Sequence, residues 1–200
     1  MQGVRRPAML SINADYGHTA PLGHLEKNFA SGRIYGLAGP NGSGKSTLLA
    51  TLGGELAPLD GTVECDGHSV GTKEHPNAVI TVAEPVFLPD LTVGEHLDLM
   101  GKAAGVDVAK LCELWALEPL LPHPASRLSS GQRQRVFLAA QLYQPARAVL
   151  IDEPERHLDA AWTEFLASEL RHLADEENRC IVVASHSDTI TQACDEVVQL

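Results

Sequence analysis

A glycine-rich stretch that ends in a lysine and a serine is the strongest chemical signal in the sequence. In "GPNGSGKST" the spacing follows the pattern GxxxxGK[ST]. Glycines let backbone amides converge on phosphate oxygens, the lysine reaches the terminal phosphates, and the serine hydroxyl binds magnesium. A tight turn alone needs neither of the last two. The pattern predicts a phosphate-binding loop made of Gly39, Pro40, Asn41, Gly42, Ser43, Gly44, Lys45, Ser46 and Thr47.

A pair of acids follows an apolar run about a hundred residues later, in "AVLIDEP". Asp152 is a candidate magnesium ligand and Glu153 a candidate general base. In isolation two acids and a proline more often only end a strand. The phosphate loop upstream favours the catalytic interpretation. His186 follows the next apolar run, and parallel strands would bring it to the same edge of the sheet, although alone it would be taken for a structural histidine.

The elements that must position these side chains can be read from the flanking sequence. "RIYGLAG" predicts a strand before the loop, and the Leu and Ala run after it predicts a helix that ends at Gly53 and Gly54. "ARAVLID" and "RCIVVASH" predict two buried strands. The amphipathic segment 159–178 between them predicts a helix, and this order implies parallel pairing with both sheet faces covered.

Two further segments complete the predicted fold. "MLSIN" and the Gly- and Pro-punctuated segment 16–32 predict a small N-terminal antiparallel β layer. Thr92 and Glu95 form a capping box, after which helical spacing continues toward Trp115. The fold class is therefore α/β, with a mostly parallel sheet and one domain over 1–200. Its α/β core would comprise 1–91 and 146–200, and an inserted helical subdomain would comprise 92–145.

Charge and composition exclude several classes of protein. The chain has 15 basic and 26 acidic residues, which argues against a primary partner of nucleic acid or anionic lipid. The four cysteines and nine histidines show no metal-ligand spacing, so we expect reduced thiols and no Cys/His metal cage. No apolar run approaches the ~20 residues of a membrane span, and "MQGVRRPAML" has no signal-peptide core. We expect a soluble, cytoplasmic protein.

Taken together, "GPNGSGKST", "LSSGQRQR", "VLIDEP", "HLD" and "SH" stand in the order and approximate spacing of the nucleotide-binding domain of the ATP-binding cassette family. The resemblance spans nearly the whole chain. It implies a magnesium-dependent ATPase in which two domains pair head to tail, as a homodimer or heterodimer. Each ATP would lie between the phosphate loop of one protomer and the signature motif of the other. The signature motif here is Leu128, Ser129, Ser130, Gly131 and Gln132.

The resemblance also implies roles for single residues. Tyr16 would stack on adenine, although a Tyr beside Gly17 is equally compatible with a hairpin. Ser46 and Asp152 would hold Mg²⁺, and Glu153 would polarise the attacking water. His186 would contact the γ-phosphate. Asp159 would couple the two ATP sites across the dimer.

Three positions depart from the family pattern. The family usually has a Gln that binds magnesium and senses the membrane partner, and an ungapped alignment puts Ala83 there. Glu84, the next residue, is a candidate replacement ligand for metal or water. Ser130 stands where Gly is usual, and Glu155 where a small or apolar residue is usual.

The signature motif begins with a second helix-capping pattern. Ser129 lies three residues before Gln132, which fits a capping box. We expect Ser129 and Gly131 to leave amides pointing outward at a helix start, where they bind phosphate. Ser130 is compatible with this arrangement if its φ is negative.

The resemblance implies an ATP-binding subunit that powers a separately encoded transmembrane permease, docked near residues 84–100 at the inner face of the membrane. One alternative is a soluble ATPase of the same superfamily that acts on ribosomes or chromosomes. The single cassette, the absence of sustained heptads and the acidic balance favour the transporter subunit. A cassette that binds ATP with little turnover remains open. Because the membrane partner selects the cargo, neither substrate nor transport direction is readable here.

Overall fold

A five-stranded parallel sheet forms the centre of the molecule. The computed structural model describes residues 8–72 and 78–200. The sheet has the order β6-β7-β8-β3-β9, and every neighbouring pair is parallel. The strands are β3 (Arg33–Ala38), β6 (Val79–Val82), β7 (Ala148–Asp152), β8 (Cys180–Ala184) and β9 (Glu196–Gln199). This order confirms the predicted parallel α/β core. Apolar runs such as β8 are buried along their whole length, as expected for strands covered on both faces.

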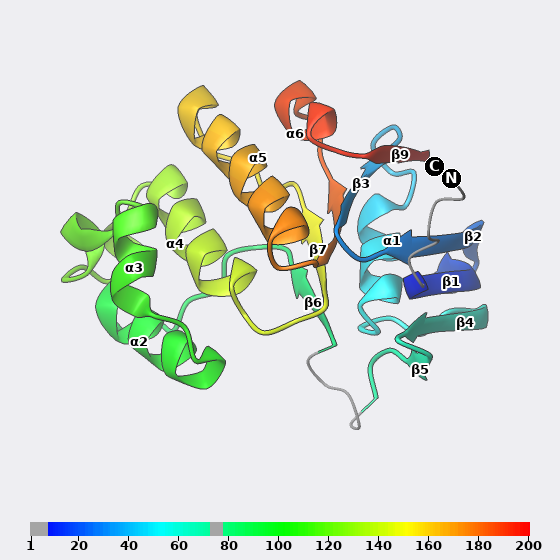
Figure 1. The fold of residues 1–200 in the computed structure, drawn as a ribbon, viewed down its shortest axis with the longest axis horizontal. Helices are drawn as coiled ribbons and strands as arrows, with labels where there is room; N and C mark the ends of the chain where they lie inside the picture. The colour runs from blue at the N-terminus through cyan, green and yellow to red at the C-terminus, as the bar shows by residue number, and fades with distance from the viewer. Residues whose placement is uncertain (1–7, 73–77) are drawn as a thin grey trace.

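A second, antiparallel sheet is built mainly from the N-terminal segment (Figure 1). Its order is β2-β1-β4-β5, with β1 (Ala8–Gly17), β2 (Pro21–Ala30), β4 (Asp60–Cys65) and β5 (His68–Ser69). The predicted hairpin of β1 and β2 is confirmed. The strands β4 and β5 were not predicted from the sequence. They are short and mostly exposed, so they carry little hydrophobic alternation.

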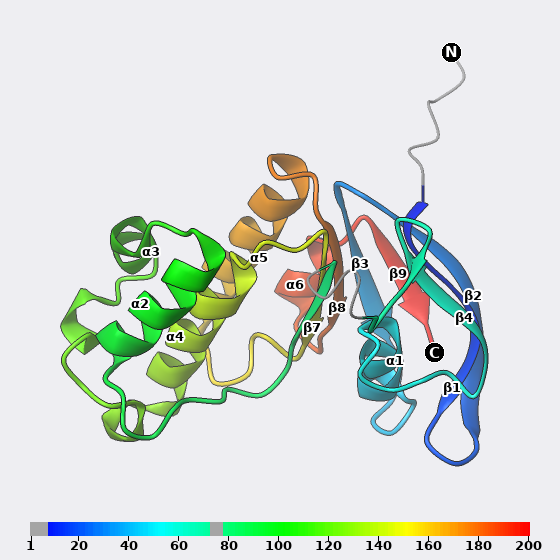
Figure 2. The ribbon, with the colours of Figure 1, turned by 90° about the horizontal axis from the view of Figure 1, so that it is seen from below.

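The helices cover both faces of the parallel sheet. Helix α1 (Lys45–Leu52) lies between the two sheets, whereas α4 (Ser130–Leu142) and α5 (Ala160–Asp175) lie on the opposite side of the parallel sheet (Figure 2). The remaining helices are α2 (Val93–Ala104), α3 (Val108–Leu114) and α6 (Asp188–Gln192). Short 3₁₀ turns span Glu118–Leu120 and Ala125–Arg127.

The structure confirms the capping box at Thr92 and corrects the helix that follows it. The Thr92 hydroxyl accepts from the Glu95 amide, and the Glu95 carboxylate accepts from the Thr92 amide. The helix does not continue unbroken toward Trp115. Gly105 ends α2 in a left-handed conformation with φ 71°, and the Asp107 carboxylate caps the new helix α3. A glycine at this position allows the turn that separates the two helices.

Alternate residues of the central strands belong to two hydrophobic cores. Leu150 and Val182 pack in the core that contains α1 and the antiparallel sheet. Ile151 and Val183 pack in the core that contains α4 and α5. This alternation follows from the two-residue period of a strand, and it explains why β7 and β8 contain few polar residues.

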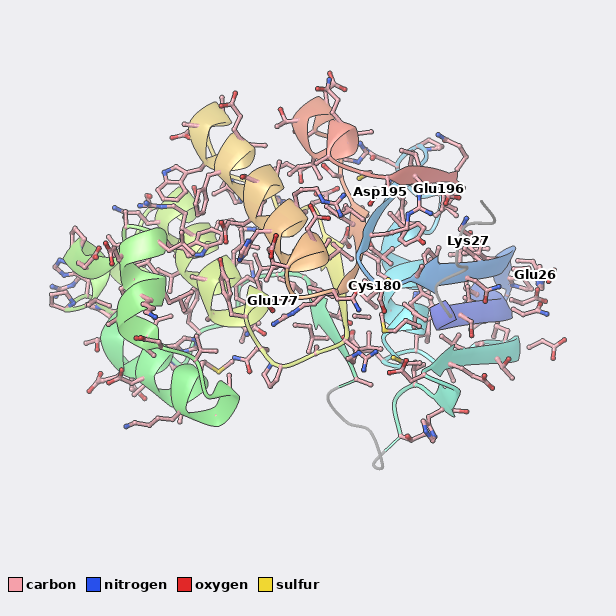
Figure 3. All side chains as sticks on the ribbon, viewed as in Figure 1. Glu26, Lys27, Glu177, Cys180, Asp195 and Glu196 are labelled. Carbon is pink, nitrogen blue, oxygen red and sulfur yellow. The ribbon has the colours of Figure 1, made fainter. Side chains whose placement is uncertain are left out.

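Charged contacts join β9 to the rest of the fold. Lys27 on β2 forms an ion pair with Glu196 on β9, and Figure 3 shows the two residues near the junction of the sheets. Asp195 accepts from the Ile34 amide at 2.8 Å and from Arg171 at 2.9 Å. Burial alone would raise the pKa of Asp195, but these donors outweigh burial and hold its pKa below the ordinary value.

Over the described residues, none of the helices combines the length and the apolar character that a bilayer crossing requires. Residues 1–7, which include most of the N-terminal segment considered for a signal peptide, lie outside the described residues, as do residues 73–77.

Candidate functional site

The phosphate-binding loop predicted from the sequence lies between β3 and α1. Gly42 and Gly44 have φ values of 82° and 94°, which L side chains rarely adopt. Gly44 is the N-cap of α1 and has no side-chain cap, so the first amides of the helix have no intrahelical acceptor. The loop therefore presents free amides and the positive end of the helix dipole at one place, which is the arrangement that binds phosphate.

Lys45 is turned back onto its own loop. Its Nζ atom donates to the carbonyl oxygens of Gly39 at 2.8 Å and Pro40 at 3.2 Å, and the side chain is buried. Within the described residues, the hydroxyl of Ser43 is buried without a hydrogen-bond partner. Lys45 therefore places an ammonium inside the loop, where two carbonyl oxygens accept its hydrogen bonds. The Ser43 hydroxyl lies in the same loop and has no acceptor among the described residues.

Asp152 and Glu153 end β7 beside this loop. A hollow of about 340 Å³ lies over the loop and is lined by Ser46, Asp152 and Glu153 among others. A larger hollow of about 570 Å³ is lined by the same three residues. Glu153 has φ 46°, and its amide donates to Ala184 at 2.8 Å. A glutamate in the left-handed region is unusual, and such backbone strain is concentrated at functional sites.

His186 lies where the parallel register predicts. Asp152 pairs with Ala184 at the end of β7 and β8, so the next residues of both strands leave the sheet together. The Nε2 atom of His186 lies 3.6 Å from Oε1 of Glu153, and about half of each side chain is exposed. The structure thus brings together Glu153 and His186, which are 33 positions apart in the sequence.

Sequence reasoning noticed Glu155 as a departure but assigned it no function. Its Oε1 atom accepts from the Ser185 hydroxyl at 2.6 Å and from the His186 amide at 3.0 Å. The available signal was a charged residue directly after the "DEP" sequence, at a position where a small or apolar side chain is usual.

The signature motif begins α4 with the predicted capping box, but one part of that prediction is wrong. The Ser129 amide does not point outward as a free donor, because it donates to Oε1 of Gln132 at 2.9 Å. The Gln132 amide in turn donates to the Ser129 hydroxyl. Ser130 is the first residue of α4. Its φ is negative, so its Cβ causes no backbone strain. Leu128, the remaining member of the motif, is buried.

Gly131 allows α4 to approach the segment after Glu155. A Cβ added at Gly131 would lie 2.8 Å from the carbonyl oxygen of His157. His157 itself has φ 69°. On the same helix, buried Gln134 donates to the Pro154 carbonyl at 2.9 Å. The beginning of α4 is therefore held against the segment that follows Asp152 and Glu153.

The larger hollow brings Ala83 and Glu84, which the sequence singled out, together with residues to which it assigned no role. Glu84 is 87% exposed, and its carboxylate lies 3.7 Å from the guanidinium of Arg156. Ala83, Arg133 and His157 line the same hollow. Arg156 lies in a loop without periodicity, so no sequence pattern indicated that its guanidinium would lie near Glu84.

The adenine-stacking role expected for Tyr16 does not fit this structure. Tyr16 is only 3% exposed and belongs to the core under the antiparallel sheet. Its ring lies against Gly23 and Gly44, where an added Cβ would come within 2.6 Å of the Tyr16 hydroxyl and 3.0 Å of its ring. Burial also raises the pKa of this phenol. Neither face of the ring is open to a base, because β2 and the phosphate-binding loop cover it.

Comparison with known proteins assigns the family. The family model described as "ABC transporter" matches residues 22–156, which is more than half of the chain. This protein belongs to the ABC transporter family. The lipoprotein-releasing system ATP-binding protein LolD of Hyphomonas neptunium is 30% identical over 213 residues, covering 96% of this chain and 92% of LolD. The tungstate uptake system ATP-binding protein TupC of Peptoclostridium acidaminophilum is also 30% identical, with 95% and 92% covered.

Other members of the ABC transporter family differ in length from this chain. The cobalamin import ATP-binding protein BtuD of Halobacterium salinarum is 31% identical over 94% of this chain, yet the chain spans only half of BtuD.

Among solved structures, an ATP-binding subunit of an ABC transporter superposes with a TM-score of 0.85 at 26% identity, over 96% of this chain and 85% of that one. A bacterial ABC transporter cassette solved as a dimer has a TM-score of 0.84 at 23% identity, over 96% and 94%, and this likeness shows the fold.

The donor atoms at this ABC family site fit magnesium. Ser46 and Asp152, which line both hollows, offer a hydroxyl and a carboxylate. Magnesium prefers oxygen ligands and is commonly held by one or two carboxylates together with substrate phosphates. In residues 8–72 and 78–200 there is no cluster of three or more Asp, Glu, His or Cys side chains that would form a protein-only cage. Two oxygen donors beside a phosphate-binding loop are consistent with a metal held jointly with a nucleotide.

Asp159 has a structural role in this fold that the motif comparison did not indicate. It is the N-cap of α5, and its carboxylate accepts from the Trp162 amide at 2.9 Å. The signal was present in the sequence as an Asp directly before the amphipathic helix. The side chain is exposed on the same loop that carries Arg156 and His157.

Proposed function

We propose that this chain binds ATP and hydrolyses it to ADP and phosphate as the ATP-binding subunit of an ABC transporter. The observation that carries the proposal is the single site shared by three features: the phosphate-binding loop, the two acids after β7, and His186. Membership in the ABC transporter family and the ATP-binding names of its relatives support the same activity. We propose that residues 39–47 bind the phosphates of ATP.

In the proposed mechanism the loop amides and Lys45 bind the phosphates. Lys45 exchanges its bonds to the Gly39 and Pro40 carbonyls for phosphate oxygens, which are stronger acceptors because they are charged. Ser46 and Asp152 would hold Mg²⁺, with Glu84 as a candidate additional ligand. The metal supplies positive charge that neutralises the phosphate oxygens.

Glu153 and His186 act on the γ-phosphate and on the water molecule that attacks it. Glu153 orients a water molecule and accepts its proton as the water oxygen attacks the γ-phosphorus, and the bond from that phosphorus to the bridging oxygen breaks so that this oxygen leaves with ADP. His186 donates a hydrogen bond to the γ-phosphate from the imidazole that now faces Glu153 at 3.6 Å. The strained backbone of Glu153 holds the carboxylate at the carboxyl end of β7, where Glu153 lines both hollows.

We propose that a second subunit completes the site, in either a homodimer or a heterodimer. Residues 128–132 would face the γ-phosphate bound by the other protomer, with the amides of Ser130 and Gly131 as donors in place of that of Ser129. Asp159 would couple the two sites through helix α5, which it caps. The chain would function as one domain, with a core of 1–91 and 146–200 and a helical subdomain of 92–145.

Turnover in the Glu153→Gln variant tests the proposed activity. We expect magnesium-dependent ATP hydrolysis by the wild-type chain, and a loss of at least about 100-fold in Glu153→Gln because the base is removed. The variant should accumulate as an ATP-bound dimer, measured by size-exclusion chromatography with ATP. Glu176→Ala, at an exposed position at the end of α5, is the matched control. Absence of turnover in the wild-type chain under all conditions would support instead a cassette that binds ATP without hydrolysing it.

A transmembrane permease is the proposed partner of this subunit. Three large apolar side chains of the segment 84–100 are exposed, Val86 at 75%, Leu88 at 49% and Leu99 at 51%, and Val86 directly follows Pro85, which lines the larger hollow. Such a surface is typical of a protein interface. We propose that the permease docks at residues 84–100 and that the subunit lies at the inner face of the membrane. Copurification of a membrane protein with the chain, reduced by Val86→Asp, would support this partner, whereas copurification of ribosomes or nucleoprotein would favour the soluble ATPase.

A further inference from the structure

Glu155 connects two loops that are thirty positions apart in the sequence. One oxygen of its carboxylate, Oε1, accepts both the Ser185 hydroxyl at 2.6 Å and the His186 amide at 3.0 Å. The Ser187 amide then donates to the Ser185 hydroxyl at 3.0 Å. Glu155 is therefore the acceptor at the end of a chain of hydrogen bonds that runs along the backbone before α6.

The residue type at this position is chemically unusual. Among the described residues, the second carboxylate oxygen, Oε2, is buried without a hydrogen-bond partner. Placing such an oxygen out of water is unfavourable, so the bonds made by Oε1 have to compensate for it. A carboxylate accepts hydrogen bonds about twice as strongly as a neutral group. A small or apolar residue here would leave the His186 amide without this acceptor.

Within residues 8–72 and 78–200, the imidazole of His186 has little else to hold it. Its side chain is half exposed, and its close polar neighbour is the Glu153 carboxylate at 3.6 Å, which is longer than a hydrogen bond. The direction of the ring therefore depends on the backbone from which it projects. That backbone is bound to Glu155 through the His186 amide, and the preceding residue is bound to it through the Ser185 side-chain hydroxyl.

We propose that Glu155 is a positioning residue that holds His186 at the site and transmits to it any movement of the segment 155–159. The Leu158 amide donates to the Glu155 carbonyl at 2.9 Å, so the start of this segment is one hydrogen-bonded turn. Asp159 lies at its end and caps α5. A displacement of this turn by a neighbouring subunit would pull directly on the backbone of His186. The consequence for catalysis rests on the function proposed above.

Amide exchange tests the connection without reference to activity. Hydrogen exchange of the His186 amide, followed by NMR in the full chain, should accelerate by about tenfold or more in Glu155→Ala, as expected when a charge-assisted bond is lost. Glu155→Gln keeps an acceptor oxygen and should accelerate exchange by less than about threefold. Glu176→Ala should leave it unchanged. An unchanged rate in Glu155→Ala would overturn the proposal.

Kinetics test the consequence for His186. We expect kcat of Glu155→Ala to fall by about 10-fold with a small change in KM, since displacement of a catalytic group by a fraction of an ångström has effects of this size. Glu155→Gln should recover most of the rate. In the double variant with His186→Ala, removal of Glu155 should have no further effect. Additive losses, or a normal kcat despite faster exchange, would overturn the positioning role.

Two further outcomes separate this proposal from the proposed function and from misfolding. If the wild-type chain hydrolyses no ATP, the proposed function fails, and the connection to His186 stands or falls on the exchange rates alone. If Glu155→Ala does not fold, Glu155→Asp provides the test, because the shorter side chain keeps the charge and withdraws the carboxylate from the His186 amide. Unchanged exchange of the His186 amide in Glu155→Asp would then overturn the proposal.

Discussion

Replacing Gly131 with alanine tests whether the first turn of α4 must lie against the segment 155–159. The added Cβ would be 2.8 Å from the carbonyl oxygen of His157, and real Cβ atoms essentially never come within 3.0 Å of another heavy atom. The obstacle is a backbone atom, so no rotation of a side chain can relieve the contact. Either the signature motif or the turn that begins at Glu155 has to move by about half an ångström.

The expected effect on stability is small, because two contributions oppose each other. Overpacking of this kind costs about 1–3 kcal/mol. Alanine in place of glycine within a helix returns up to about 1 kcal/mol. We therefore expect the free energy of unfolding to fall by about 1 kcal/mol, which lowers Tm by about 2–4 °C in a chain of this size.

The expected effect on turnover is much larger. Either the signature amides or the segment 155–159 would be displaced, and catalytic sites tolerate displacements of only about 0.5 Å. We expect ATP hydrolysis by Gly131→Ala to fall by about 10- to 100-fold. Gln141→Ala, near the other end of α4, is the control for a substitution in the same helix. Turnover equal to the wild type together with an unchanged Tm would show that the close approach to His157 is not required, and would refute the reasoning.

Two other predictions concern contacts away from the phosphate-binding loop. Tyr143 accepts from buried Trp115 at 3.1 Å and donates to Glu169 at 2.5 Å, so Tyr143→Phe should lower the free energy of unfolding at pH 7 by about 2 kcal/mol, measured by urea denaturation. Burial first, and then the bond to Glu169, raise the pKa of this phenol above its ordinary value, so its contribution is present below about pH 10 and lost as the pH rises further. The stability of the wild type should fall more steeply than that of the variant above pH 10, and parallel curves would contradict this. Glu84→Ala should shift the magnesium dependence of hydrolysis more than the affinity for nucleotide without metal, because the carboxylate lies at the hollow beside Arg156. Identical magnesium titrations would exclude a metal-binding role for Glu84.

Much of the fold could be predicted because its signals are local. The strand, loop and helix around Lys45 follow from glycine spacing and from apolar runs, and the capping boxes at Thr92 and Ser129 follow from residues three positions apart. Segments with weak periodicity escaped prediction. The strands β4 and β5 carry mostly exposed residues, and the break between α2 and α3 depends on the left-handed conformation of Gly105.

The chemistry proposed for the site follows from the sequence alone, because motifs of fixed spacing select residue types suited to phosphate, metal and water. Which side chains meet was decided only by the tertiary structure, because contacts between distant segments depend on register and packing. Burial removes Tyr16 from the surface on which a base would stack, and the parallel register brings His186 to Glu153. The contact of Glu155 with the His186 amide was likewise decided only by the tertiary structure. It requires two loops to leave neighbouring strands at the same edge of the sheet, which no local pattern specifies.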